Sequence, residues 1–501
     1  MSQEPYSVPA GGRSRLRPES IRAWPPYRTF LFALLLIFAA KQAFNVVVFP
    51  PFTGHDEVAH YAYLRTVATE HRVPVIPDLE EWRNAWAVRG ELPGDTLPDD
   101  LYQYCRYVLD WNFCDEPQWR NNPPQAVTLS GETYPHGWQY AANHPPLFYV
   151  LLTPAYLATE RFSPSTQQYI FRALTVPIGM LIIVLTYLIA GLIFPRDRFM
   201  LAVAPTFVAF QTQLSYESAM VNNDILLVGL FTLLIYLLVR GVMRRFSAGS
   251  AAVIGLVLGI GLLAKASMLA GAPLIAVAMI LGVGIRNVRR WIPLGAITAV
   301  VAGMVAAPWY IFLYRTYGNL SGLDQVKALQ FQWTYRFSDP PSMLDMLFDK
   351  GFALWRWRET WGEFGWRLIH LEGWLLTLIG IPLLIMALAA LATMIRDLVT
   401  RSRTGEPLLD RRQTIAIWLL LLVALVAYGA MLQFGTTFQL TQARYFFNAM
   451  AAVAILLAFG YRALLPVRVR PVGVVAFLMF MVGINVLIYS QAVLPYWYLA
   501  S

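Results

Sequence analysis

Residues Ile178–Phe194 read IGMLIIVLTYLIAGLIF, a run without a single charged side chain. Phe30–Ala40 and Ile415–Ala430 are equally free of charge. A helix crosses the bilayer core with about 20 apolar residues, and backbone groups in lipid must find hydrogen bonds within their own segment. None of the three runs alternates apolar and polar residues, as the strands of a membrane β-barrel do. These runs predict an all-α integral membrane protein.

The composition of the whole chain supports this prediction. Of its 501 residues, 57% are hydrophobic and 14% are charged, whereas about a quarter of the residues in a soluble domain are charged. The formal net charge of +9 comes from arginines that form short clusters between apolar runs, as in loops on one membrane face. The chain has no glycine-rich phosphate loop and no zinc-finger spacing, so it is not expected to bind nucleic acid.

The basic clusters also predict the topology. All of them fall on one membrane face if the chain crosses the bilayer about eleven times. Because basic loops stay in the cytoplasm, we expect a multi-pass protein of the cell (plasma or inner) membrane with a cytoplasmic N-terminus. The predicted spans are residues 29–50, 169–194, 199–215, 225–240, two spans within 250–285, 291–312, 371–395, 413–433, 443–461 and 472–493.

The topology divides the chain into four parts. Residues 1–28 are a basic cytoplasmic tail, and residues 29–312 are a transmembrane module. This module includes a long extracytoplasmic loop, 51–143, and an apolar segment, 144–160, which is too short to span and is predicted to lie in the outer interface. Residues 313–370 form a second extracytoplasmic loop, and residues 371–501 form the C-terminal helices.

Both cysteines, Cys105 and Cys114, fall in the first extracytoplasmic loop. They are either two free thiols or one disulfide. The disulfide is favoured because that face can be oxidising and the chain has no other cysteine.

Two adjacent carboxylates follow the first helix. Asp56 and Glu57 begin an apparent amphipathic helix, and His60 lies four residues after Asp56, on the same helix face. Asp56 can take a proton from an acceptor hydroxyl, or bind a cation together with His60. The alternative is a purely structural role, because Thr53 and Asp56 have the spacing of a capping box.

A third acid, Asp224, follows the third helix on the same predicted face. It either caps the next helix or faces Asp56 across a cleft. Asp56, His60 and Asp224 are the candidates for a metal site.

The cations on that face are Arg172, Lys265 and Arg444. Each can merely extend to the interface, but three around one cavity favour a bound anion such as a lipid-linked phosphate. Lys41, in the middle of the first helix, suggests an internal acid as its partner, which the sequence does not identify.

The second extracytoplasmic loop contains the segment WRWRETWGEFGW, residues 355–366. An interfacial aromatic belt explains its tryptophans. A lid that contacts sugar or lipid is the alternative, because aromatic rings stack on sugars and guanidinium groups bind phosphates. Arg358 and Glu359 are harder to explain by a belt alone.

These motifs, in this order, resemble the GT-C superfamily of membrane glycosyltransferases. The resemblance covers residues 28–465 and is carried by the carboxylate pair, the HPPLF segment starting at His144, Arg172 and Asp224. It is nearest to the protein O-mannosyltransferases and the lipid A aminoarabinose transferase. Residues 361–366 and Gln442–Tyr445 also look like an uncharacterised bacterial branch of this superfamily.

The resemblance implies an inverting transfer from a polyprenyl-phosphate sugar donor to a glycan, lipid or protein acceptor outside the cell. Asp56 would activate the acceptor, and Glu57 would support the turn or a cation. His144, Lys265 and Arg444 would hold the donor phosphate. His60 departs from the pattern of the characterised enzymes, so a divalent cation (magnesium or manganese) stays open. A transporter or flippase of lipid-linked glycans, and a non-catalytic scaffold of envelope assembly, are the alternative functions.

Overall fold

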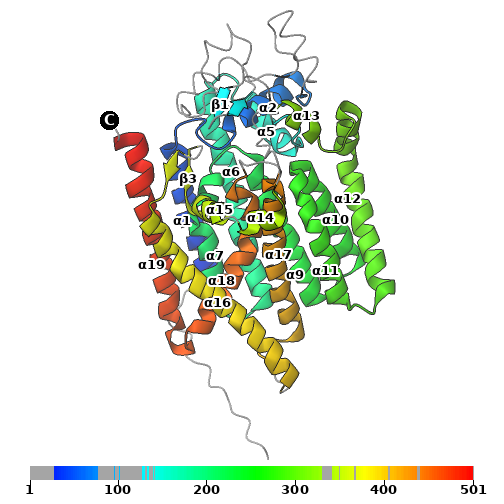
Figure 1. The fold of residues 1–501 in the computed structure, drawn as a ribbon, viewed down its shortest axis with the longest axis vertical. Coiled ribbons are helices and arrows are strands. Elements are labelled where there is room, and N and C mark those ends of the chain that lie inside the picture. The colour runs from blue at the N-terminus through cyan, green and yellow to red at the C-terminus, as the bar shows by residue number, and fades with distance from the viewer. Residues whose placement is uncertain are drawn as a thin grey trace, which may run out of the picture.

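A computed structural model describes residues 27–76, 95, 101, 127–129, 132–134, 139, 141–329, 341–348, 350–365, 368–403, 407–436 and 441–499. The predicted disulfide between Cys105 and Cys114 lies outside these residues. The described chain is a bundle of roughly parallel helices with short helices across one end (Figure 1).

Eleven apolar helices lie where the sequence predicts spans. They are α1 (Tyr27–Val48), α6 (Pro164–Ile193), α7 (Arg198–Phe210), α9 (Asn223–Arg244), α10 (Ala248–Ala264), α11 (Gly271–Val283), α12 (Val288–Tyr317), α16 (Gly373–Arg403), α17 (Arg411–Gly435), α18 (Met450–Leu464) and α19 (Arg470–Ile488). Short 3-10 segments, η2 (Ala266–Ala270) and η3 (Ala443–Ala449), precede α11 and α18. Within the described residues, nine helical segments are long and apolar enough to cross a membrane, and α7 and α10 are shorter.

The remaining elements are short. The interfacial segment forms α5 (Leu147–Ala158), which packs against α2 (Glu57–Glu70). The other short elements are α8 (Thr212–Glu217), α13 (Leu323–Leu329), α14 (Met343–Phe348), α15 (Lys350–Trp361), η4 (Val467–Val469), η5 (Tyr489–Val493), η6 (Pro495–Leu499) and two antiparallel hairpins, β1 (Val127–Leu129) with β2 (Glu132–Tyr134), and β3 (Glu363–Phe364) with β4 (Ile369–His370).

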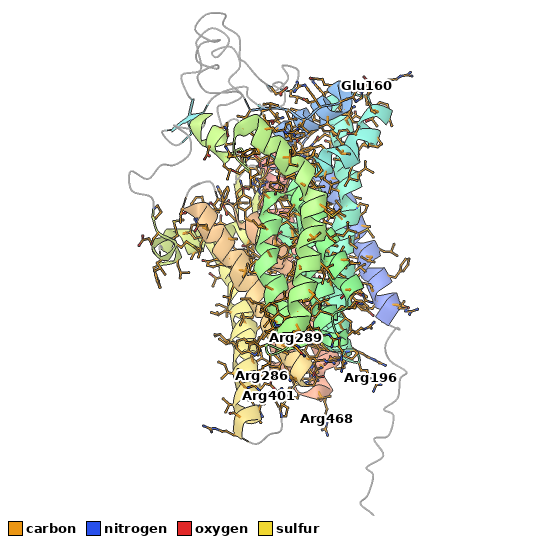
Figure 2. The ribbon with its side chains drawn as sticks, turned by 90° about the vertical axis from the view of Figure 1, so that its right-hand side faces the viewer. Glu160, Arg196, Arg286, Arg289, Arg401 and Arg468 are labelled. Carbon is orange, nitrogen blue, oxygen red and sulfur yellow. The ribbon has the colours of Figure 1, made fainter. Side chains whose placement is uncertain are left out.

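The two ends of the bundle differ in charge. Figure 2 shows the labelled arginines Arg196, Arg286, Arg289, Arg401 and Arg468 at one end, which we call the arginine end, and Glu160 at the opposite end. The opposite end carries α2 and α5 (Figure 1) and is called the α2–α5 end. This separation agrees with the prediction that the basic clusters share one face.

The third predicted span, 199–215, is broken in the structure. Helix α7 ends at Phe210, and the side chain of Gln211 starts α8 by accepting a hydrogen bond from the Leu214 backbone N–H at 2.6 Å. A break leaves backbone carbonyls of the last helical turn without partners. Lys41 is the partner of one such carbonyl, because its Nζ donates a hydrogen bond to the Ala209 carbonyl at 2.6 Å.

Lys41 therefore has a structural partner, but not the internal acid that the sequence suggested. Its other acceptors are also neutral: Ser215 Oγ at 2.6 Å and Asn485 Oδ1 at 3.3 Å. A cation near the carbonyl end of a helix is favoured by the helix dipole. The charge in the middle of α1 thus stabilises the broken helix.

A buried ion pair joins α2 to α6. The guanidinium of Arg172 donates to both carboxylate oxygens of Glu57, at 2.8 Å and 2.5 Å, and neither side chain has exposed surface. Its other hydrogens bind the carbonyls of Val46, Phe49 and Pro50 at the end of α1. Glu57 also accepts from the backbone N–H groups of Gly54 and Val221, both at 2.9 Å.

The prediction that Arg172 binds a substrate anion is therefore replaced. Glu57 has one of the two roles that the resemblance implies, because its carboxylate holds the turn. All five N–H donors of Arg172 are used within the protein, so none remains for a donor phosphate. Arg172 also lies inside α6, which begins eight residues earlier at Pro164, and not at the start of a helix. The pair is structural and holds the turn that carries Asp56.

We expect Arg172→Gln to destabilise the protein by about 3–5 kcal/mol, because the carboxylate of Glu57 would stay buried without its partner. Arg161→Gln is the matched control, since Arg161 is exposed on the turn before α6. Thermal unfolding in detergent measures the stability of both variants. Equal midpoints for the two variants would contradict the structural role. The double variant Arg172→Gln/Glu57→Gln should recover part of the loss.

Candidate active site

Asp56 lies on a tight turn between α1 and α2. Its backbone is left-handed, with a φ of 60°, and Phe52 in the same turn has a φ of 66°. Left-handed conformations are unfavourable for residues with a side chain and persist where the surroundings hold them. The buried carboxylate of Glu57 binds the N–H of Gly54 at the centre of this turn. The neighbouring residue thus fixes the position of Asp56.

The capping alternative for Asp56 is wrong. Asp56 precedes the first residue of α2, but its side chain makes no capping hydrogen bond. The hydroxyl of Thr53 donates to the Pro50 carbonyl at 2.7 Å instead of completing a capping box. The carboxylate of Asp56 is 22% exposed and does not cap α2.

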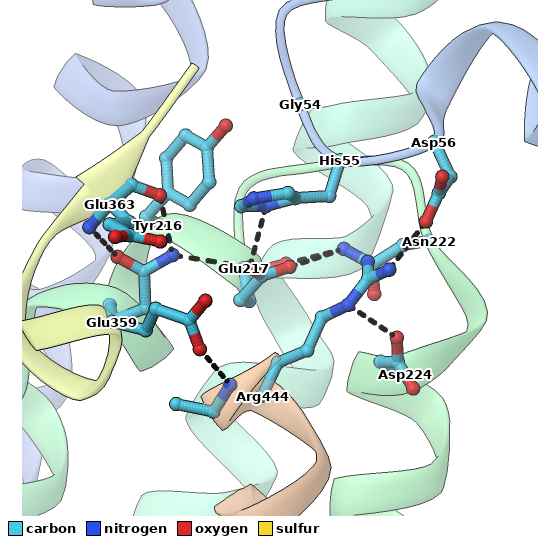
Figure 3. A network of polar contacts seen from close by, with 12 residues as sticks. Gly54, His55, Asp56, Tyr216, Glu217, Asn222, Asp224, Glu359, Glu363 and Arg444 are labelled. Atoms are coloured by element: carbon cyan, nitrogen blue, oxygen red, sulfur yellow. Dashed lines mark hydrogen bonds and ion pairs between the residues drawn. The ribbon is translucent and has the colours of Figure 1, made fainter. Parts of the chain in front are cut away.

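Four alternating charges run across the site. Arg444, in η3, binds the carboxylate of Asp56 and lies with its Nε 3.4 Å from Asp224 Oδ2 (Figure 3). Lys265, between α10 and η2, binds the other oxygen of Asp224. The sequence prediction that Asp224 faces Asp56 is confirmed, and Arg444 bridges them. The capping alternative for Asp224 is wrong, because Asn222 caps α9 by accepting from the Ile225 N–H at 3.1 Å.

The charge of Arg444 acts on Asp56. Burial alone would raise the pKa of the Asp56 carboxyl, but the Arg444 guanidinium, with smaller contributions from His60 and His55, holds the pKa well below its usual value. Asp56 is therefore ionised at neutral pH. Arg444 Nη1 has no hydrogen-bond acceptor among the described residues, so this donor can bind a ligand.

His60 and His144 lie side by side near these charges, with ring centroids 5.9 Å apart. His60 Nδ1 is 2.9 Å from the Tyr149 hydroxyl, and His144 Nδ1 is 3.4 Å from Asn223 Nδ2. Burial is the main cause that lowers the pKa of His60 to about 4 and that of His144 to about 3. Both rings are therefore neutral at pH 7, and each can donate one hydrogen bond and accept another.

A second polar cluster lies on the other side of Arg444. Glu217 is 3.2 Å from His55 Nδ1 and accepts hydrogen bonds from the side chains of Gln213 and Asn222 (Figure 3). The Gln213 amide exchanges two hydrogen bonds with the Glu363 backbone, at 3.2 Å and 3.1 Å. This cluster joins the turn of Asp56, through His55, to β3 of the second predicted loop.

The sequence reasoning assigned no role to His55, Gln213, Glu217 or Glu363. The signal that points to Glu217 is an acid in an otherwise uncharged stretch at a predicted helix end, where an ionisable residue is costly. The partners of Glu217 come from distant segments, so spacing does not reveal them.

Glu359 and Arg358 have different environments. Glu359 is buried, and it accepts from the Ala443 backbone N–H at 2.7 Å and pairs with Arg356 at 3.0 Å. The prediction that Glu359 binds substrate is replaced by a structural role, because its carboxylate holds the residue before Arg444. The guanidinium carbon of Arg358 lies 6.0 Å from the ring centroid of Trp355. Arg358 also lines a crevice next to η3.

This crevice, which we call the α15–α16 crevice, has a volume of about 790 Å³. Its walls are mostly apolar and come from α7, α15, α16, α17, η3 and α18. Trp357 and Trp361 of α15 line it together with Arg356 and Arg358.

The metal candidates Asp56, His60 and Asp224 do not form a ligand set. Among the described residues, no group of three or more histidine, cysteine, aspartate or glutamate side chains is arranged to hold a metal ion. The cations next to Asp56 and Asp224 are the side chains of Arg444 and Lys265. A divalent cation stays a prediction from the sequence.

A family model described as "Predicted membrane protein (DUF2142)" matches residues 41–457. The match covers most of the chain, including Asp56, Asp224, Lys265 and Arg444. The chain belongs to this family. A comparison with curated protein sequences finds no match.

Solved structures show what the fold of this family member resembles. Archaeal oligosaccharyltransferase AglB from Archaeoglobus fulgidus, in complex with an inhibitory peptide and a dolichol-phosphate, matches with a TM-score of 0.50 and 13% identity over 91% of this chain and 55% of that chain. ArnT from Cupriavidus metallidurans, bound to undecaprenyl phosphate, matches with a TM-score of 0.46 and 15% identity over 94% of this chain and 73% of that chain. The family member thus spans about half the length of AglB. The GT-C resemblance of the sequence is confirmed at the level of the fold.

The buried histidines predict a loss of stability in mild acid. The folded-state pKa values of His60 and His144 lie below the value of about 6.5 for an unfolded histidine, so below pH 6.5 the native state binds fewer protons than the unfolded state. Stability should fall from pH 6.5 towards pH 4, by roughly 2 kcal/mol for each histidine at pH 5. Unfolding midpoints between pH 7 and 5 measure this loss. His60→Gln/His144→Gln should flatten the profile, and an unchanged slope would contradict the prediction.

Proposed function

We propose that this protein is a membrane glycosyltransferase. It transfers a sugar, with inversion, from a polyprenyl-phosphate donor to an acceptor on the extracytoplasmic face, which corresponds to the α2–α5 end. The observation that carries the proposal is the ionised, partly exposed carboxylate of Asp56, which shares Arg444 with Asp224 and lies beside buried neutral histidines. The GT-C fold and the lipid phosphates in AglB and ArnT suggest the class of donor.

Asp56 acts as the general base in this proposal. The acceptor oxygen attacks the anomeric carbon, the bond from that carbon to the phosphate oxygen breaks, and its electron pair leaves with the phosphate. The proton of the acceptor hydroxyl passes to Asp56. A carboxylate with a lowered pKa is a weak base, but the developing bond makes the hydroxyl more acidic, so a base that is fully ionised at neutral pH suits this step.

Arg444, Lys265 and His144 hold the leaving phosphate. Phosphate binding by arginine and lysine stabilises the negative charge that grows as the bond breaks, which is the largest contribution that a protein can make to this reaction. Arg444 has a free donor at Nη1, and neutral His144 can donate a further hydrogen bond. Asp224 keeps Lys265 and Arg444 together while no phosphate is bound.

The α15–α16 crevice holds the isoprenoid chain of the donor. Its apolar walls match a hydrocarbon chain, and its volume of about 790 Å³ is in the range of ligand pockets. Phe446 lines the crevice two residues after Arg444, so one segment contributes to both the crevice and the charged site. Arg358 of α15 lines the crevice and binds the donor phosphate while the donor enters.

We expect Asp56→Asn to reduce transfer by about 10²- to 10⁴-fold, because the amide cannot accept the proton. Purified protein in detergent is tested with a panel of polyprenyl-phosphate sugars and glycan, lipid and protein acceptors. Asp324→Asn, on an exposed residue of α13, is the matched control and should keep full activity. Wild-type rates in the Asp56→Asn variant would remove Asp56 as the base. Absence of transfer and of donor hydrolysis with every sugar would contradict the proposed function.

We also expect Ala387→Trp, which fills the α15–α16 crevice, to raise KM for a long-chain donor about tenfold or more and to change KM for a short-chain donor little. Ala387 lines the crevice and is exposed, so the larger ring does not disturb the core. The control is Val300→Trp on α12, because Val300 is 59% exposed and does not line the crevice. Equal effects on both chain lengths would contradict the assignment of the crevice.

A further inference from the structure

A second large pocket lies at the arginine end, whereas the candidate active site lies towards the opposite, α2–α5 end (Figures 1 and 2). It has a volume of about 810 Å³ and lies between the turn that joins α6 to α7 and the segment that joins α18 to α19. Gln413 of α17 completes its wall, and the Gln413 amide donates to the Ile193 carbonyl at 2.8 Å. The residues of this pocket have no part in the proposed transfer.

The pocket is strongly positive. Four arginines and one aspartate line it, which leaves a surplus of three positive charges: Arg196, Arg198, Arg462 and Arg470 against Asp197. The aspartate is already committed, because its carboxylate binds Arg462 and accepts hydrogen bonds from the backbone N–H groups of Phe199 and Met200, at 3.1 Å and 3.2 Å. The surplus charge is therefore not balanced within the pocket.

Arg470 has no carboxylate partner in this pocket. Its guanidinium donates to two backbone carbonyls, of Leu465 at 3.4 Å and of Arg462 at 3.5 Å, and both contacts are long. Arg196 is exposed on the α6–α7 turn, on the opposite wall. Arginine side chains from two walls of one pocket suit a phosphate group, which accepts several hydrogen bonds at once.

Aliphatic side chains continue from the charged pocket onto the outside of the bundle. Val467 lines the pocket and is 70% exposed, and Val472 beside it is 69% exposed. Phe199 and Val474 provide further apolar wall. In a chain that spans a membrane, exposed aliphatic groups at a helix end face acyl chains. The pocket thus combines a cationic centre with an apolar exit towards lipid.

We propose that this pocket binds one anionic phospholipid of the membrane leaflet at the arginine end. Arg196 and Arg470 hold the phosphate of the headgroup, and an acyl chain lies along Val467 and Val474. Negatively charged lipids are attracted to basic groups at the membrane surface, and the enclosed pocket adds selectivity for one molecule. Because the site joins the turns before α7 and α19, a bound lipid also ties these two helices together.

Native mass spectrometry of the full chain, with added phosphatidylglycerol, phosphatidylcholine or inorganic phosphate alone, tests the proposal. Wild type should retain one phosphatidylglycerol in preference to phosphatidylcholine. Arg196→Gln/Arg470→Gln should weaken this binding roughly thirty-fold, on the contribution of each arginine to the binding of an anionic lipid. Arg286→Gln/Arg289→Gln is the matched control, because these exposed arginines lie at the same end but outside the pocket.

The control should keep wild-type lipid binding. Equal losses in the two double variants would mean general attraction to a basic surface and would overturn the proposal. Retention of inorganic phosphate as strong as that of the lipid would also overturn it, because the ligand would then be a free anion. If the double variant does not fold, Arg196→Gln alone, on the exposed turn, must still lower the retention of phosphatidylglycerol, and unchanged retention would reject the site.

Discussion

The carboxylate of Glu57 and the guanidinium of Arg172 form an ion pair without exposed surface, and the candidate site is built on it. Charges at this depth are stable only if every donor and acceptor has a partner. The pair meets this demand with carbonyls from the end of α1 and with N–H groups of Gly54 and Val221. Three segments far apart in the sequence are thereby joined: the turn after α1, the outer part of α6 and the turn before α9. Asp56 lies on the first of these segments, and Asp224 follows the third, in the first turn of α9.

The charges around Asp56 follow from this arrangement. Asp56, Arg444, Asp224 and Lys265 alternate in sign, so each carboxylate is neutralised by a cation from another helix end. In a poorly solvated site, two carboxylates next to one guanidinium need a second cation to balance their charge, and Lys265 supplies it. Arg444 is placed in turn by Glu359, which binds the preceding residue and thus joins the tryptophan-rich α15 to the site. A ligand that competes for Arg444 acts on Asp56, on Asp224 and on the position of α15.

The sequence predicted the helices well because charge-free runs of sufficient length have no other stable structure in lipid. It also predicted that Asp56, Asp224, Lys265 and Arg444 lie on one face, and the structure places these four side chains together. It could not separate Arg172 from Arg444, because only the contacts in the folded chain show that all five N–H donors of Arg172 are used within the protein. The break after α7 and the partners of Lys41 depend on packing between helices distant in the chain. The cluster of His55 and Glu217 depends on such packing as well, and no spacing rule reports it.

The charged site at the α2–α5 end is proposed to bind a lipid-linked phosphate. A cryo-EM structure of the full chain in a lipid nanodisc, with polyprenyl phosphate added, tests this binding. Phosphate density is expected in contact with Arg444 and Lys265, and density for the isoprenoid chain is expected in the α15–α16 crevice. Polyprenyl phosphate bound elsewhere on the protein, with the Arg444 to Asp56 contact and the crevice unchanged, would rule out this site.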